Sequence, residues 1–232
     1  MFNKLKTAVR LYLDHWTIWL GVGAIYALVY YGFYLLGQLT ESLPILTWCL
    51  SALQLLVYLY LFIGITQLCV SIVAQAQTSQ RNVYVGLKTL FTPFDRLWEP
   101  FFLLAALYGL IVLSLQIVLR PEWGLGEIWL EVFLSMCGYL LVLGLLFSFQ
   151  LALHFNLEAD LTITEAYGAS AKTVFGNFGS TALVDVVIGM LSFVGYVSQV
   201  LLFFLVPLAL LLLSVHYFRC TRQLKATSTA IN

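Results

Sequence analysis

Asp185 is the residue of this sequence best placed to do chemistry inside a membrane. It lies about eight residues into the apolar run that starts at Asn177, hence about 12 Å deep at 1.5 Å per residue. A carboxylate at the centre of a membrane helix costs about 2.5–3.5 kcal/mol, so Asp185 needs a protein or water neighbour. It could relay protons or cations, or it could hold the last two helices to a neighbour. Gln199 is the second intramembrane polar residue, and a hydrogen bond between helices explains it.

Three histidines are the candidate cofactor ligands. His15, His154 and His216 lie near the predicted cytoplasmic ends of their helices. Two imidazoles at equal depth can ligate a haem iron, and one can hold the magnesium of a chlorophyll. Interfacial histidines without a cofactor are commoner, and the four cysteines form neither a CxxC pair nor a cluster with histidine at metal spacing. We therefore expect no cofactor and no metal.

Carboxylates could also support acid–base catalysis. Glu158, Asp160 and Glu165 cluster between two predicted spans, and Glu127 and Glu131 lie on the opposite side of the membrane. Neither group has a histidine or a nucleophile at useful spacing, whereas acyl and phosphoryl chemistry need such groups to converge. Helix capping and solvation explain these carboxylates, so we do not expect an enzyme.

The elements that hold these residues are predicted to be membrane helices. Only 9% of the 232 residues are charged and 62% are hydrophobic, whereas about 25% of the residues of a soluble domain are charged. A soluble protein could not bury so much apolar surface. We expect an all-α fold that forms a single membrane domain over residues 1–232, with lipid as its solvent and no nucleic acid among its partners.

Six stretches are apolar and long enough to cross a bilayer, which takes about 20 residues. The last apolar run, 177–218, has 42 residues and is too long for one span, so we expect a break at Gly195–Ser198. The predicted spans are 16–37, 45–74, 100–119, 128–153, 177–194 and 198–218.

The positive charges predict the orientation. With six spans and a cytoplasmic N-terminus, ten of the eleven lysines and arginines fall on cytoplasmic segments, and only Arg120 falls outside. This is the bias that the positive-inside rule describes. We therefore expect both ends of the chain on the cytoplasmic side of a bacterial inner membrane. An internal membrane such as a thylakoid would give the same pattern.

A short motif recurs ahead of the apolar runs. The segment 88–94 (KTLFTPF) returns 84 residues later as 172–178 (KTVFGNF), and residues 5–9 carry a weaker copy. This spacing predicts three hairpins, each preceded by an amphipathic helix in the membrane interface. The alternative is that the motif arose twice because an interfacial helix needs a cation followed by aromatic residues. The predicted repeats lie near 1–74, 75–153 and 154–232. The predicted lipid contacts are Lys6, Lys88, Lys172, Phe91, Phe94, Phe175 and Phe178.

The third interfacial helix has its own start signal. Thr162 and Glu165 fit a capping box, in which the hydroxyl and the carboxylate each satisfy a free backbone N–H. A helix is predicted from there toward Val174. Its small side chains would suit close packing against another helix. They are Ala166, Ala169, Ser170 and Thr173.

The last third of the chain resembles a broad group of bacterial six-helix membrane proteins. The similar residues are Ala166, Ser170 and Asn177, followed by a hairpin, Pro207 and Tyr217. The group includes YciC-like proteins and the membrane domain attached to some glycerophosphodiester phosphodiesterases, and the likeness is clearest over 150–218. The resemblance implies a six-helix membrane fold. Because most of these families are uncharacterised and the soluble phosphodiesterase barrel has no counterpart here, it implies no activity and no catalytic residue.

Two classes of function remain. The first is a non-catalytic scaffold, assembly factor or accessory subunit of a membrane complex, or a protein that organises lipid. Its partners would be membrane lipids and other membrane proteins or further copies of itself. The short connections and the aromatic residues at both interfaces favour it. The second is a small transporter or channel in which Asp185 is the coupling or selectivity group.

Overall fold

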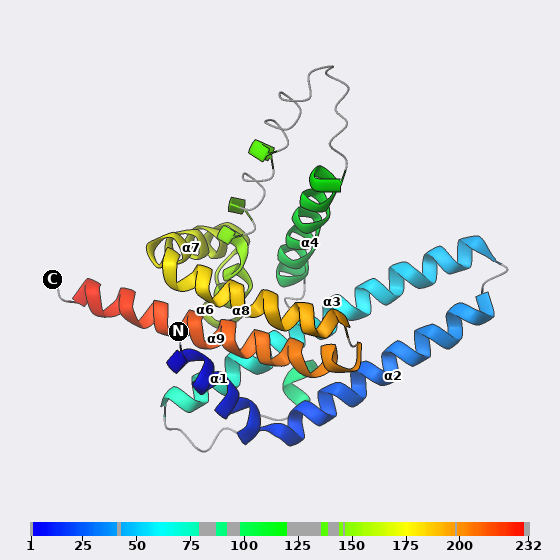
Figure 1. Ribbon diagram of the computed structural model, residues 1–232, viewed down its shortest axis with the longest axis horizontal. Coiled ribbons are helices and arrows are strands. Elements are labelled where there is room, and N and C mark those ends of the chain that lie inside the picture. Colours follow the sequence, from blue (N-terminus) through cyan, green and yellow to red (C-terminus); the bar gives the residue numbers. More distant parts are fainter. Residues whose placement is uncertain are drawn as a thin grey trace. The chain divides into compact units, whose positions relative to one another are not determined.

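The computed structural model describes residues 2–40, 43–78, 87–91, 98–119, 136–138, 144–145, 147–197 and 199–229. None of these residues forms a strand and almost all are helical, which confirms the predicted all-α class for the described part of the chain. The chain folds as two compact units, whose helices are labelled in Figure 1. Unit 1 comprises Met1–Asp95 and Gly179–Asn232, and unit 2 comprises Arg96–Phe178.

Unit 1 begins with a short amphipathic helix followed by a long apolar one. α1 is Phe2–Asp14 and α2 is Trp16–Thr40, with His15 between them. Tyr12 of α1 stacks on Trp19 of α2, with ring centroids 5.6 Å apart and planes 1° from parallel. Because Trp19 is only 1% exposed, this stack fixes the orientation of α1 relative to α2.

The next helix of unit 1 contacts a short 3₁₀ turn at a glycine. α3 is Pro44–Thr78, and the turn η1 is Leu87–Phe91. A Cβ at Gly64 of α3 would lie 2.3 Å from the carbonyl oxygen of Leu90, so only glycine permits this approach. Leu90 is buried as a result, whereas Phe91, next in the repeated motif, is 49% exposed.

The predicted break in the long apolar run is confirmed. α8 is Phe178–Val197 and α9 is Gln199–Thr229, so the first helix ends and the second begins next to Ser198. α3 and α1 both pack against α9, as Figure 1 shows. The core between α3 and α9 consists of fully buried aliphatic side chains, which include Ile65, Leu68, Leu211 and Leu212.

Unit 2 contains three described helices, which side chains join to one another. They are α4 (Trp98–Leu119), α6 (Ala152–Ala159) and α7 (Ile163–Gly176). Asn156 of α6 donates through Nδ2 to Oε2 of Glu99 in α4 at 3.0 Å. This bond holds α6 to the beginning of α4.

The small-residue face predicted for α7 packs closely in unit 2. Ala166 and Ser170 are 0% exposed and Thr173 is 1% exposed. The Ser170 hydroxyl donates to the carbonyl oxygen of Ser148 at 2.6 Å and accepts from the amide of Leu151 at 3.1 Å. Short side chains allow this approach of α7 to the backbone of 148–151.

Within the described ranges, four helices are long and apolar enough to cross a membrane, which marks the chain as a membrane protein. They correspond to the first, second, fifth and sixth predicted spans. The third predicted span coincides with α4, in which a shorter apolar stretch, Glu99–Leu110, was found. The fourth falls mostly outside the described residues. The number of six spans and the hairpin arrangement therefore stay predictions. The four are Trp16–Thr40, Ile45–Gln77, Phe178–Gly195 and Phe204–Arg222.

The predicted start of α7 is confirmed. The backbone N–H of Thr162 donates to Oε2 of Glu165 at 3.1 Å, and the Thr162 hydroxyl donates to the same oxygen at 2.7 Å. These two bonds, the hydroxyl bond first, hold the pKa of Glu165 below its ordinary value of 4.5. The ionised carboxylate is thus part of the helix start.

Replacing Glu165 with Gln is expected to loosen the first turn of α7 and to remove its pH dependence. A carboxyl group with a lowered folded-state pKa stabilises the fold above its unfolded-state pKa, and this contribution is lost as the pH falls through the folded-state pKa. After correction for intrinsic rates, the hydrogen-exchange protection of the Ala166 amide, which donates to the Thr162 carbonyl at 2.8 Å, should therefore decrease below about pH 4.5 in the wild type only. Glu158→Gln, which removes an exposed carboxylate from α6, should keep the wild-type profile. Equal profiles for the wild type and Glu165→Gln would contradict the role of the carboxylate.

Candidate functional site

Asp185 and Gln199, which were predicted to lie inside the membrane, belong to α8 and α9. Asp185 is half-buried on α8, and Gln199 is the first residue of α9, with its side chain outside the described part. Asp185 is one helical turn from Thr181, so both lie on the same face of α8. Thr181 is fully buried, and its hydroxyl belongs to the polar cluster that is described next.

A buried polar cluster joins α1 to α8 and α9. Nζ of Lys4 lies 2.5 Å from Oγ of Ser180 and 2.7 Å from Nδ1 of His216. The other ring nitrogen of His216, Nε2, lies 2.9 Å from Oγ1 of Thr181. His216 and Thr181 are 0% exposed and Lys4 is 9% exposed. We call these four residues the Lys4 cluster.

The donors and acceptors fix one arrangement of protons when Lys4 is charged. An ammonium group only donates, so Nδ1 of His216 accepts from it, and Nε2–H donates to Thr181. Burial lowers the pKa of Lys4 from its ordinary value; Cys220 opposes this shift and the Arg219 guanidinium adds to it. The cluster is therefore a cation held by neutral partners.

A second set of contacts joins α1 to the end of α9. The Arg219 guanidinium donates through Nη2 to the carbonyl oxygen of Asn3 at 3.3 Å and to the Thr7 hydroxyl at 3.4 Å. Cys220, which is 1% exposed, places its sulfur 3.6 Å from Nδ1 of His216. The end of α9 thus contacts α1 through side chains on both sides of Lys4.

The chemistry open to this cluster depends on the charge of Lys4. An uncharged lysine next to a serine hydroxyl is the arrangement in which the amine acts as general base for a nucleophile. A charged lysine instead donates to Ser180 and His216 and holds α1 in place. We favour the charged form because it can donate to both of its neighbours, Ser180 and His216. The cluster is then a clamp.

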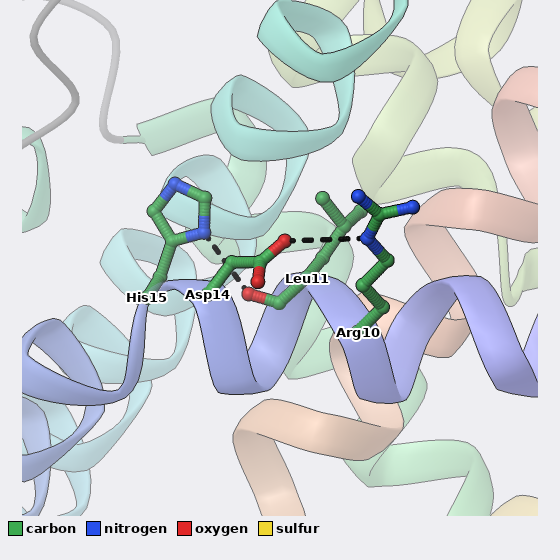
Figure 2. Close-up of polar contacts among 4 residues, drawn as sticks. All are labelled: Arg10, Leu11, Asp14 and His15. Atoms are coloured by element: carbon green, nitrogen blue, oxygen red, sulfur yellow. Dashed lines mark hydrogen bonds and ion pairs between the residues drawn. The ribbon is translucent and has the colours of Figure 1, made fainter.

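The three histidines differ in what their ring nitrogens contact. Figure 2 shows the His15 ring turned back along α1, with Nδ1 3.0 Å from the carbonyl oxygen of Leu11. Both nitrogens of His216 are engaged in the Lys4 cluster, so iron or magnesium ligation would first have to break one of those contacts. His154 belongs to unit 2 and is 1% exposed. In the described part of the chain no three His, Cys, Asp or Glu side chains gather as a metal site would require.

The helix α1 has three faces, and the surroundings of each face differ. Lys4, Ala8 and Leu11 are buried against the rest of unit 1. A second, apolar face is exposed, although its spacing of three and four residues is that of a buried stripe. It consists of Phe2 (77% exposed), Val9 (37%), Leu13 (61%) and Trp16 at the start of α2 (57%). The predicted place of this helix at the membrane interface stays a prediction.

The third face of α1 is polar and borders a pocket of about 420 Å³. Besides Leu11, its lining includes Lys6, Thr7, Arg10 and Asp14 of α1, and Ala76 from the end of α3. Arg10 and Asp14 lie side by side in Figure 2, with Nε of Arg10 3.7 Å from Oδ2 of Asp14.

The predicted lipid contacts stay predictions, and the structure shows only how exposed some of these side chains are. Lys6 and Lys172 are exposed. Phe175 and Phe178 are 55% and 58% exposed, and both rings also contact Phe147 within unit 2. The Lys88 side chain and Phe94 lie outside the described residues.

The sequence interpretation missed Lys4, Ser180 and Thr181. In the sequence, Lys4 is one of the ten cations predicted on cytoplasmic segments, yet its side chain is buried. The available signal was its spacing from Ala8 and Leu11, which places a cation in line with two apolar residues on one helical face. No local signal marked Ser180 or Thr181, because small hydroxyl residues are common in membrane helices.

The comparisons with known proteins identify no relative of this chain. No protein-family model, curated protein or solved structure matches the chain.

Proposed function

We propose that this chain is a non-catalytic membrane protein that serves as a scaffold, an assembly factor or an accessory subunit, or that organises lipid. The observation that carries the proposal is α1, which is clamped at Lys4 and yet leaves an apolar stripe exposed at its other face. An exposed apolar face on a fixed helix is a surface for lipid or for another membrane protein. The likeness to six-helix bacterial membrane proteins, most of them uncharacterised, is compatible with such a role.

The proposed setting is a bacterial inner membrane with both chain ends in the cytoplasm. The positive-inside count supports it, since the cations on α1, on α7 and at the end of α9 then share one side. α1 and the end of α3 meet at the pocket, as they would if both lay on the cytoplasmic side. Neither a cofactor nor a metal is part of this proposal.

A small transporter or channel is the second candidate, and one observation favours it. Asp185 lies one turn from Thr181, whose hydroxyl contacts His216 and, through it, Lys4. Polar groups that follow one another along a membrane helix are a common feature of proton relays. In this alternative, Asp185 would be the coupling group, at the opposite end from Lys4 of the series of polar groups.

Mild extraction and reconstitution separate the two candidates. For an accessory protein, extraction in a mild detergent should yield a species heavier than the 26.1 kDa monomer by native mass spectrometry. Reconstituted vesicles should then show the same proton and cation flux for the wild type and for Asp185→Asn. A lone monomer together with a flux that Asp185→Asn abolishes would replace the proposed function with the second candidate.

A further inference from the structure

The polar face of α1 forms a pocket of the size used for small ligands. Its volume of about 420 Å³ lies within the range of about 300–1,000 Å³ that is common for such sites. Leu11 of α1, which is buried, and Ala76 of α3 supply the apolar walls. The polar groups come from Lys6, Thr7, Arg10 and Asp14. A few polar groups over an apolar base is the usual composition of a ligand site.

The charges around the pocket favour an anion. Lys6 and Arg10 line it, and Arg219 reaches Thr7 from α9 at 3.4 Å. Among the residues that line the pocket, two cations stand against one carboxylate, Asp14, which leaves a net charge of +1. Arg10 engages Asp14 only through Nε at 3.7 Å, so the two terminal nitrogens of its guanidinium point away from that pair in Figure 2. A planar pair of N–H donors suits two oxygens of a phosphate.

The neighbouring face of α1 indicates where this phosphate comes from. Val9, Leu13 and Trp16 are exposed next to the polar face, and α1 leads directly into the long apolar helix α2. A helix of this kind lies at the level of lipid headgroups. A phosphate at this depth belongs to a phospholipid rather than to a solute.

We propose that the pocket lined by Lys6, Thr7, Arg10, Leu11, Asp14 and Ala76 binds the headgroup of a membrane phospholipid. The proposal rests on the proposed function as a lipid-contacting membrane protein and adds a particular site and ligand class to it. Arg10 and Lys6 hold the phosphodiester. Asp14, which only accepts hydrogen bonds, contacts a donor at the far end of the headgroup.

Asp14 gives the site its selectivity. An ethanolamine ammonium or a glycerol hydroxyl can donate to the carboxylate, whereas the methylated ammonium of choline carries no N–H. Phosphatidylethanolamine and phosphatidylcholine have the same net charge, so a preference between them reports this contact rather than general electrostatic attraction.

The test is native mass spectrometry of the full chain in mild detergent, titrated with phosphatidylethanolamine or phosphatidylcholine of identical acyl chains. The wild type is expected to bind phosphatidylethanolamine at least about fivefold more tightly. Arg10→Gln should weaken that binding about tenfold, the loss expected for a charge-assisted contact. Asp14→Asn should abolish the preference between the two lipids.

Arg222→Gln is the matched control, because it removes the same charge from an exposed position of α9 that does not line the pocket. It should leave both affinities unchanged. Unaltered protection of Cys220 from a thiol reagent shows that Arg10→Gln and Asp14→Asn are folded. Soluble glycerophosphoethanolamine tests whether the site binds a free headgroup instead of a lipid, and it should bind much more weakly than phosphatidylethanolamine.

Three results would overturn the proposal: equal binding of the two lipids by the wild type, an equal loss in Arg222→Gln and Arg10→Gln, or glycerophosphoethanolamine binding as tightly as the lipid. These outcomes are independent of the test of function. A lone monomer that still prefers phosphatidylethanolamine would contradict the accessory role and leave the headgroup site standing. A stable complex without lipid preference would contradict the headgroup site and leave the accessory role standing.

Discussion

Gly64→Ala is expected to destabilise unit 1 by about 3 kcal/mol or more, at the upper end of what overpacking costs. The added Cβ would lie 2.3 Å from the carbonyl oxygen of Leu90. A backbone oxygen cannot rotate away as the end of a side chain can, so η1 as a whole has to move from α3. Because Leu90 is 1% exposed, this movement also uncovers a buried leucine. The measurement is the unfolding free energy in mixed detergent micelles.

Two other glycines provide the controls for this substitution. At Gly32 of α2 an added Cβ meets nothing within 4 Å, so Gly32→Ala should be neutral or slightly stabilising because alanine favours helix. At Gly21 the nearest atom is the tip of the Leu87 side chain, 2.8 Å away, which can shift at lower cost. If Gly64→Ala were as stable as Gly32→Ala, η1 would not pack on α3 in this way.

His216→Leu is expected to cost about 3 kcal/mol, because it removes Nδ1, one of the two acceptors of the buried Lys4 ammonium, and the Nε2–H that donates to the Thr181 hydroxyl. Lys4→Met should cost less, about 1 kcal/mol, since it removes the buried charge together with the contact. The double variant should therefore be more stable than His216→Leu alone, with a coupling of about 2 kcal/mol. A chain in which the two losses simply add would have no such cluster.

Cys220 offers a direct readout of the same cluster. Its thiol is 1% exposed and lies 3.6 Å from His216, so release of α1 should make it react with a maleimide. His216→Leu should raise that labelling rate, and the double variant should restore part of the protection. His15→Leu is the matched control, because His15 contacts only the nearby Leu11 carbonyl among its described polar neighbours and should leave Cys220 protected. Site-resolved mass spectrometry separates Cys220 from the exposed Cys49 and Cys137.

The elements that sequence reasoning predicted well are those with local causes. The helix break next to Ser198 followed from the length of the apolar run, and the start of α7 followed from Thr162 and Glu165. A bilayer sets the length and polarity of each span separately, and a cap involves residues three positions apart, so neither depends on a distant partner.

The repeated motif shows where local reasoning stops. Residues 88–91 of its first strong copy lie in the 3₁₀ turn η1 and the rest of that copy lies outside the described residues, whereas its second copy runs from α7 into the start of α8. Similar letters thus take different local structures, because the contact of Leu90 with Gly64 constrains the first copy. The threefold repeat and the six-span arrangement stay predictions.

The sequence by itself predicted an all-α membrane protein and the positions of the four long apolar helices. Only the tertiary structure decided that Lys4 is a buried anchor while Lys6 and Arg10, on the same helix, border a pocket. The partners Lys4 and His216 are 212 positions apart. Periodicity assigns a residue to a face of its helix, but it does not say which element covers that face. In lipid, moreover, apolar surface alone does not select a neighbouring helix, so the polar contacts that do select it appear only once the helices are packed.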